Sequence, residues 1–251
     1  MNLKKRLKLK KITVGSWITI GDSSVAEIMA KSDFDWLVVD MEHSAIELDA
    51  AQKLIRIIEL AGCIPLVRVG ENNPALIKRV MDAGAHGVVV PMVNSKEEAI
   101  RAVRAVKYPP GGIRGVGLAR AQGYGMSFES YKNWLNQNSI VIVQIEHINA
   151  VKNLQQILDV EGVDGFIVGP YDLSGSIGKP GEFNDPEVKA ALERIKIVAE
   201  QLHKPSGIHV IPPDYREVNK RIKEGYSFIA FSLDTLFLGK SCRNGLSKIT
   251  R

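Results

Sequence analysis

Residues 64–106 read IPLVRVGENNPALIKRVMDAGAHGVVVPMVNSKEEAIRAVRAV and contain the repeating unit of the chain. Two short apolar runs, Ile64 to Val69 and Gly87 to Pro91, each precede an amphipathic segment. These segments are Pro74 to Asp82 and Lys96 to Val106. The runs are nearly continuous in Val and Ile rather than alternating, which is typical of strands covered on both faces. The stretch therefore predicts strand, helix, strand, helix.

The same alternation extends in both directions from this stretch. Six further β-branched runs are predicted as strands: Ile12 to Trp17, Asp35 to Val39, Ile140 to Ile145, Gly165 to Val168, Gly207 to Val210 and Phe228 to Phe231. Further amphipathic segments are predicted as helices: Glu47 to Ala61, Ala150 to Leu158, Pro186 to Leu202 and Tyr215 to Lys223. Eight strand and helix units in 251 residues predict an α/β fold, a (β/α)8 TIM barrel. A doubly wound sheet is the alternative, although it would usually show fewer strands and a Gly-rich phosphate turn after the first.

No Pro- or Gly-rich linker divides residues 1–251, so we expect a single domain. The longest interruption, Lys107 to Ser139, contains Pro109-Pro110-Gly111-Gly112 and four more glycines. A connection of this length usually serves the mouth of a pocket or a contact between subunits. Gly175 to Gly181 resembles a phosphate loop only superficially, because Pro180 follows the lysine where a P-loop needs Ser or Thr.

Composition places the chain among ordinary globular proteins, with 45% hydrophobic and 24% charged residues. The net charge is +5, but six of the 33 basic residues fall within the first eleven positions. The remaining 27 basic residues face 28 acidic ones, so the body of the protein is nearly neutral. We interpret the basic segment as a helix that rests Leu3 and Leu7 on the domain, and we expect no nucleic-acid partner.

Two features bear on location. No apolar run reaches the length of a membrane span, and no secretory signal follows Met1, so we expect a cytoplasmic protein without a membrane partner. Cys63 and Cys242 lie far apart without a zinc spacing, and we expect both to be buried as small apolar residues.

Polar residues collect where the predicted strands end, which in a barrel is the functional end. Strand two ends in Asp40-Met41-Glu42-His43, strand three near Arg68, strand five in Gln144-Ile145-Glu146-His147 and strand six in Gly169-Pro170-Tyr171-Asp172. Glu146 and Asp172 fall on neighbouring strands, and two carboxylates suit a hard divalent cation such as Mg²⁺ or Mn²⁺. Either acid could instead cap a helix. Arg68 beside such a cation favours an anionic ligand between them.

His43 is the histidine best placed to carry a proton, because it has acids beside it at the functional end. We expect His203 at the surface, His86 in a structural position at the opposite end, and His147 and His209 as candidate supporting groups. No predicted strand ends in a lysine at the barrel mouth, which argues against a Schiff-base mechanism.

Six ordered motifs carry a resemblance to a known family. They are Asp40-Met41-Glu42-His43-Ser44, Leu66-Val67-Arg68-Val69, Val90-Pro91-Met92-Val93, Tyr108-Pro109-Pro110-Gly111-Gly112-Ile113-Arg114-Gly115, Gln144-Ile145-Glu146 and Gly169-Pro170-Tyr171-Asp172-Leu173-Ser174. In this order the chain resembles the HpcH/HpaI aldolases, the metal-dependent class II pyruvate aldolases, from about Gly15 to Asp234. The resemblance implies a carbon–carbon lyase that reversibly cleaves a 4-hydroxy-2-oxo acid, of the 2-keto-3-deoxy type, to pyruvate and an aldehyde.

The resemblance also implies roles for particular residues. Glu146 and Asp172 would ligate a divalent cation (Mg, Mn or Co), and His43 would be the base. Arg68 would stabilise the enolate of pyruvate, whose carboxylate Gln144 and the backbone around Tyr171 and Asp172 would hold.

The family pattern assigns to Asp82 the role of raising the basicity of the histidine. Since Asp82 ends a helix at the far side of its own barrel, it could reach a site through a neighbouring subunit, and Asp40 is the local substitute. By resemblance the chain is a homo-oligomer, a hexamer in which the C-terminal helix (Leu236 to Ile249) packs on a neighbouring subunit.

Two departures from the family pattern concern the aldehyde. Tyr171 replaces a usual small residue, and His147 replaces a common threonine. A CoA-thioester lyase or an oxaloacetate decarboxylase could use the same metal and enolate, and a non-catalytic barrel or a nucleic-acid-binding protein is the alternative from another class. The sequence leaves the aldehyde, the metal, the reaction direction and the stereochemistry open.

Overall fold

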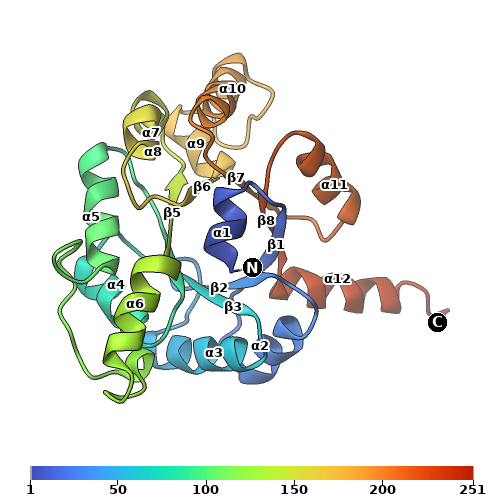
Figure 1. Cartoon of the computed structure of the whole chain (residues 1–251). Coiled ribbons are helices and arrows are strands. Elements are labelled where there is room, and N and C mark those ends of the chain that lie inside the picture. The colour runs from blue at the N-terminus through green and yellow to red at the C-terminus, as the bar shows by residue number, and fades with distance from the viewer. Residues whose placement is uncertain (1, 251) are drawn as a thin grey trace.

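The computed structural model describes residues 2–250 as a closed barrel of eight parallel strands, which confirms the predicted (β/α)8 fold (Figure 1). Each strand pairs with the next along the chain, and β8 pairs with β1. The strands are β1 (Thr13–Ile18), β2 (Trp36–Asp40), β3 (Ile64–Arg68), β4 (Gly87–Val90), β5 (Ile140–Ile145), β6 (Gly165–Val168), β7 (Ser206–Val210) and β8 (Phe228–Leu233). All eight predicted strands are therefore present, with ends within two residues of the prediction.

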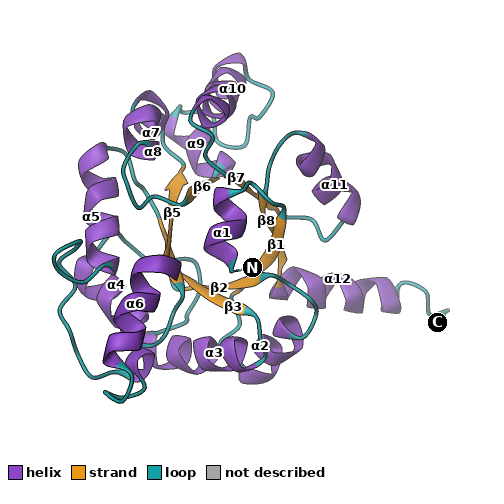
Figure 2. Cartoon of the chain, in the orientation of Figure 1, coloured by secondary structure: helices purple, strands orange, loops and turns teal. Residues whose placement is uncertain are grey.

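Helices surround this barrel as an outer ring, as the colouring by secondary structure shows (Figure 2). They are α1 (Leu3–Lys8), α2 (Ser23–Ala30), α3 (Leu48–Leu60), α4 (Pro74–Asp82), α5 (Lys96–Val106), α6 (Phe128–Asn138), α7 (Ile148–Lys152), α8 (Leu154–Leu158), α9 (Pro170–Ser176), α10 (Pro186–Gln201), α11 (Tyr215–Lys223) and α12 (Asp234–Leu246). The helices α4, α5 and α11 have the predicted bounds. The helix predicted over Ala150 to Leu158 is split at Asn153 into α7 and α8.

Helix starts follow ordinary capping chemistry. Asn73 accepts hydrogen bonds from the backbone at the start of α4, whose first residue is Pro74. Ser95 and Glu98 form a capping box at the start of α5. These caps satisfy backbone donors that a helix start leaves free, so the turns that leave β3 and β4 are held in fixed positions.

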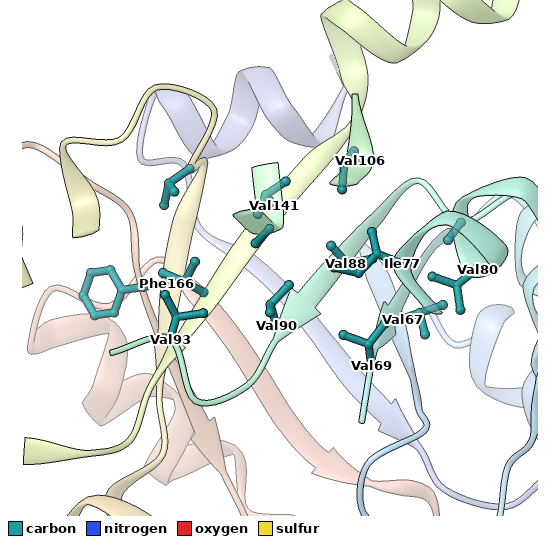
Figure 3. Close-up of a cluster of buried hydrophobic side chains, with 14 of the residues drawn as sticks. Val67, Val69, Ile77, Val80, Val88, Val90, Val93, Val106, Val141 and Phe166 are labelled. Carbon is teal, nitrogen blue, oxygen red and sulfur yellow. The ribbon is translucent and has the colours of Figure 1, made fainter. Parts of the chain in front are cut away.

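The apolar core between barrel and helices is built from the outward side chains of the strands (Figure 3). Val67 of β3 and Val88 and Val90 of β4 lie in one cluster with Ile77 and Val80 of α4. These strand residues alternate along the backbone with residues that point into the barrel. The alternation matters for function, because the inward positions at the carboxyl ends of the strands form the mouth.

The amino-terminal end of the barrel is closed by α1, which lies within the ring of strands in Figure 1. Leu3 and Leu7 are buried against the lower barrel interior, where the rings of Trp36 and Phe228 stack at 4.1 Å. A Cβ on Gly15 would lie 2.1 Å from the Trp36 ring, so only glycine leaves room for that indole. The basic segment thus buries its leucines as interpreted.

The connection from α5 to β5, residues 107–139, lies at the same end of the barrel. It contains α6, which the sequence did not predict, and a short 3-10 turn at Arg120–Gln122. Together with Glu59 and His86 it lines a cavity of about 590 Å³. His86 contacts Glu59 at 3.2 Å and packs against Trp134, which agrees with its predicted structural position.

The carboxyl-terminal helix α12 extends away from the barrel (Figure 1). Asp234 is its one buried residue, and Leu238 and Leu246 are exposed. The prediction that both cysteines are buried is wrong for Cys242, because this helix has no core to cover it, whereas Cys63 is buried. None of the helices within residues 2–250 has the length and apolarity needed to cross a membrane.

Candidate active site at the barrel mouth

A cavity of about 110 Å³ opens at the carboxyl ends of the strands. Side chains from β1, β3, β5 and β7 and from the loops after β2 and β6 converge on it. It is lined by Trp17, His43, Arg68, Gln144, Tyr171, Asp172, His209, Ile211 and residues 167–170. Five of the residues singled out from the sequence therefore meet at one cavity, as the rule on strand ends predicts. Among residues 2–250 no lysine lines it.

Arg68 is fixed in the centre of this mouth. Asp40 lies opposite it in the register of β2 and β3, and its carboxylate accepts from Nε at 2.9 Å and from Nη2 at 2.6 Å. The Nη1 atom lies 3.1 Å from Oε2 of Glu42, and the guanidinium stacks 4.4 Å from the centre of the Trp17 ring. Two acids and one indole thus hold the planar fork in a single orientation.

The turn after β2 presents His43. Oδ1 of Asp40 accepts hydrogen bonds from the backbone N–H groups of Glu42 and His43, at 3.0 and 3.2 Å. Asp40 therefore fixes both the turn and Arg68. Burial alone would raise the pKa of Asp40, but the hydrogen bonds and charge of Arg68 outweigh it and hold this pKa below its ordinary value.

The imidazole of His43 is itself open to solvent, with 65% of the side chain exposed. Its Nε2 atom lies 3.8 Å from Oε2 of Glu42, whereas Asp40 contacts only the backbone of this histidine. Asp40 is therefore not the acid beside the ring. Glu42 occupies that place.

Glu146 is a buried carboxylate at the end of β5. Its Oε1 atom accepts from the backbone N–H of Met92 at 2.7 Å, and its Oε2 atom accepts from the amide of Gln144. Burial raises the pKa of Glu146, and the charge of Asp172 adds to the rise. The carboxylate is therefore oriented and at the same time poorly compensated.

Asp172 is exposed in the first turn of α9, and no side-chain cap hydrogen bond forms there. Its alternative role as a helix cap is therefore not realised. The backbone that leads to it approaches Glu146 closely, since a Cβ on Gly169 would lie 2.8 Å from Cβ of Glu146. Glycine at this position lets β6 deliver Asp172 beside the carboxylate of β5.

Negative charge at the mouth exceeds positive charge. Glu42 shows this most clearly: burial raises its pKa from 4.5 to about 7, Arg68 opposes the rise, and the charges of Glu146, Asp40 and Asp172 add to it. Four carboxyl groups thus share one guanidinium. A divalent cation among them would offset this repulsion.

The residues at the mouth fit such a cation. Mg²⁺ is commonly bound through one or two carboxylates while it keeps several waters, and Glu146 and Asp172 supply two. Within residues 2–250 no group of three or more acidic, His or Cys side chains is assembled for a metal, so substrate or water would complete the shell. In the same described part, the buried Oε1 of Gln144 has no hydrogen-bond partner, which leaves an acceptor free for a ligand.

Asp82 is the one sequence-predicted site residue that the chain does not bring to this mouth. It ends α4 on the outside of the barrel, where its carboxylate lies 2.6 Å from Nη2 of the buried Arg114. The ring of His147 is also committed elsewhere, because its Nδ1 atom caps α7 by accepting from the backbone of Asn149.

Three further residues at the mouth had no assigned role in the sequence analysis. Glu42 was noted only as part of a strand end, Trp17 only as the end of a predicted strand, and His209 only as a candidate supporting group. Inward parity on β1 and β7 is the signal that places Trp17 and His209 at the cavity wall. The raised pKa of Glu42 depends on burial, which the sequence does not give.

A closed (β/α)8 barrel with a polar, acid-rich mouth defines the class of TIM-barrel enzymes. The profile of the HpcH/HpaI aldolase/citrate lyase family matches residues 13–243. The chain belongs to this family and is an aldolase, a carbon–carbon lyase. The family is known for metal-dependent class II aldolases.

Individual relatives agree with this assignment. Over 243 residues the chain is 39% identical to the 4-hydroxy-2-oxo-heptane-1,7-dioate aldolase of Shigella sonnei, covering 96% of this chain and 91% of that protein. A crystal structure of an HpcH/HpaI aldolase/citrate lyase family protein from Burkholderia cenocepacia superposes with a TM-score of 0.92 at 33% identity, over 98% of both chains. The citrate synthase SbnG is similar at 28% identity with a TM-score of 0.85, over 98% of this chain and 96% of that one.

Proposed function

We propose that this chain is a divalent-metal-dependent aldolase that reversibly cleaves a 4-hydroxy-2-oxo acid to pyruvate and an aldehyde. The convergence of Glu146 and Asp172 with Arg68 and His43 on one cavity carries the proposal. The similarity to a 4-hydroxy-2-oxo-heptane-1,7-dioate aldolase supports the substrate class.

Glu146 and Asp172 are the residues that would hold the cation. Both are hard oxygen ligands, and the excess of carboxylates around them favours a doubly charged ion such as Mg²⁺, Mn²⁺ or Co²⁺. When bound, such an ion supplies Lewis-acid polarisation of the 2-keto group.

The chain's own residues account for the proton and the charge. In the cleavage direction, His43 takes the proton of the 4-hydroxyl group, the C3–C4 bond breaks, and its electron pair moves towards C2 and the keto oxygen. The guanidinium of Arg68, already oriented by Asp40, stabilises the negative charge that develops on that oxygen. A proton returned to C3 then completes pyruvate.

Binding of the substrate carboxylate falls to the residues around β5 and β6. Gln144 and the backbone at Tyr171 and Asp172 line the same cavity as Arg68. Tyr171 is 55% exposed at the rim and packs edge-on against Phe183. We assign the carboxylate to this side, with Tyr171 at the edge where the aldehyde enters.

A neighbouring subunit accounts for the two features that one chain leaves open. Asp82 faces outward and would raise the basicity of a partner's histidine, and α12 exposes Leu238 and Leu246. We propose a homo-oligomer in which α12 packs on the next subunit. Leu238→Glu should then lower the mass measured by light scattering, and an unchanged mass would contradict this packing.

Other lyase reactions could use the same mouth. The similarity to a citrate synthase keeps oxaloacetate and acyl-CoA substrates in view. Assays of purified protein with oxaloacetate or with acetyl-CoA distinguish them. Decarboxylation or thioester chemistry that is faster than aldol cleavage would displace the aldolase assignment.

The direct test measures pyruvate release from a 4-hydroxy-2-oxo acid before and after removal of metal by EDTA. We expect activity to vanish and to return when Mg²⁺, Mn²⁺ or Co²⁺ is added. Activity that survives complete metal removal would rule the mechanism out.

Two histidine variants separate the proposed base from a structural residue. His43→Ala should slow proton exchange of pyruvate much more than it weakens metal binding. His203→Asn, at an exposed histidine of the opposite end, is the matched control and should leave both unchanged. Equal loss of exchange and of metal binding in His43→Ala would assign that residue a structural role.

A further inference from the structure

His209 is a polar side chain on the wall of the mouth to which the proposed reaction gives no task. On β7 its neighbours Ile208 and Val210 lie in the core beneath the helices, so His209 points inward. It lines the same cavity as Arg68 and Asp172, and its ring centre lies 5.7 Å from that of Trp17.

The position of its ring proton follows from a bulge in β8. Two residues of β1, from Gly15 to Trp17, span three residues of β8, from Ala230 to Leu233. Ser232 within this bulge has a φ of 53°, and its carbonyl oxygen accepts from the Ser16 hydroxyl at 3.1 Å. The same oxygen lies 3.2 Å from Nε2 of His209.

A carbonyl oxygen can only accept, so the proton of the neutral ring resides on Nε2. The lone pair of a neutral His209 is consequently on Nδ1. Within residues 2–250 no group donates a hydrogen bond to Nδ1, and this atom is not fully enclosed by protein. The bulge in β8 thus fixes an acceptor on the wall of the cavity.

The ring stays neutral at physiological pH. Burial lowers the pKa of His209 to about 4, and the positive charge of Arg68 contributes, against smaller opposing effects of the Ser232 carbonyl and Asp40. His209 is therefore a fixed hydrogen-bond acceptor at neutral pH rather than an acid or a base.

We propose that His209 is a specificity residue that accepts a hydrogen bond from a hydroxyl group of the substrate. This inference rests on the proposed aldolase function. The hydroxyl could belong to the 2-oxo acid, as in hydroxypyruvate, or to the aldehyde, as in glycolaldehyde. A methyl group in the same place would leave the acceptor without its partner, which disfavours the apolar analogue.

The experiment compares isosteric substrates in the wild-type, Mn²⁺-loaded protein and in two variants. Hydroxypyruvate is matched with 2-oxobutanoate in the donor arm, and glycolaldehyde with propanal in the acceptor arm. His209→Leu keeps an apolar wall and removes the acceptor, whereas His209→Gln retains one. One neutral hydrogen bond corresponds to about a tenfold change in kcat/KM.

We expect His209→Leu to lose about tenfold on the hydroxylated member of one arm and less than about twofold on its isostere. His209→Gln should recover part of that loss. The arm in which the loss occurs identifies which substrate carries the hydroxyl. Equal losses on both members of each pair would overturn the inference and leave the aldolase function intact.

A binding measurement keeps the test independent of turnover and of how well a variant folds. In wild-type protein labelled with ¹⁵N at histidine, the Nδ1 resonance of His209 should shift on addition of the hydroxylated ligand and not of its isostere. A resonance that shows Nδ1 protonated would overturn the inference. Wild-type protein that neither binds nor turns over any 2-oxo acid would instead refute the proposed function, and this inference with it.

Discussion

Raising the pH from 6 to 8 should tighten the binding of a divalent cation at the barrel mouth. Glu42 is the source of this dependence, since its side chain is only 15% exposed and its pKa is raised from 4.5 to about 7. The protonated, neutral form therefore prevails below pH 7. A cation favours the ionised form, so at lower pH binding must first displace a proton.

The magnitude follows from the ionised fraction. With a pKa of about 7, that fraction rises from about 0.1 at pH 6 to about 0.9 at pH 8, so the dissociation constant should fall by about tenfold. This corresponds to about 1.4 kcal/mol of binding free energy. Glu146, whose pKa is also raised, shifts the affinity in the same direction.

Calorimetric titration with Mn²⁺ at pH 6, 7 and 8, in two buffers of different ionisation enthalpy, measures both the affinity and the protons released. Glu42→Gln is the matched control, because it keeps the size of the side chain and removes its titration. We expect the variant to lose most of the pH dependence. An affinity that is equal at pH 6 and pH 8, or a variant with the wild-type slope, would refute the reasoning.

Three substitutions test other parts of the structure. Arg68→Lys should lower kcat by about 100-fold, because a point charge cannot replace the planar fork that contacts Asp40 and Glu42, and steady-state kinetics of pyruvate release measure this; near-normal turnover would contradict the role. Gly15→Ala should cost at least about 2 kcal/mol of unfolding free energy in a urea titration, since its Cβ would meet the Trp36 ring, and an unchanged midpoint would refute that contact. Leu7→Ala should cost about 2–4 kcal/mol in the same titration if α1 closes the barrel, whereas the exposed Leu9→Ala should cost little; similar effects of the two would count against the closure.

The barrel could be predicted from the sequence because each strand is a local pattern. Runs such as Ile140 to Ile145 are buried on both faces, and their continuous apolar character shows it without any knowledge of the tertiary contacts. Other features depend on those contacts. The division between α7 and α8 at Asn153 and the bulge at Ser232 have no comparable local signal. The exposure of Cys242 likewise depends on a helix that leaves the barrel.

The site could be predicted in part for the same reason. Parallel strands bring their carboxyl ends to one edge, so Arg68, Gln144 and Asp172 could be grouped from their places at strand ends. Asp82 could not be grouped with them, because its motif resembles the family's while its helix places it beside Arg114. The importance of Glu42 came from burial and from the charges of acids on other strands.

The proposed metal site is tested most directly by a crystal of the protein grown with Mn²⁺ and a non-reacting pyruvate analogue. Data collected near the manganese absorption edge locate the ion from its anomalous signal. We predict one peak between the carboxylates of Glu146 and Asp172, with the analogue between that peak and Arg68. A mouth without a peak, or an ion bound away from both carboxylates, would contradict the account.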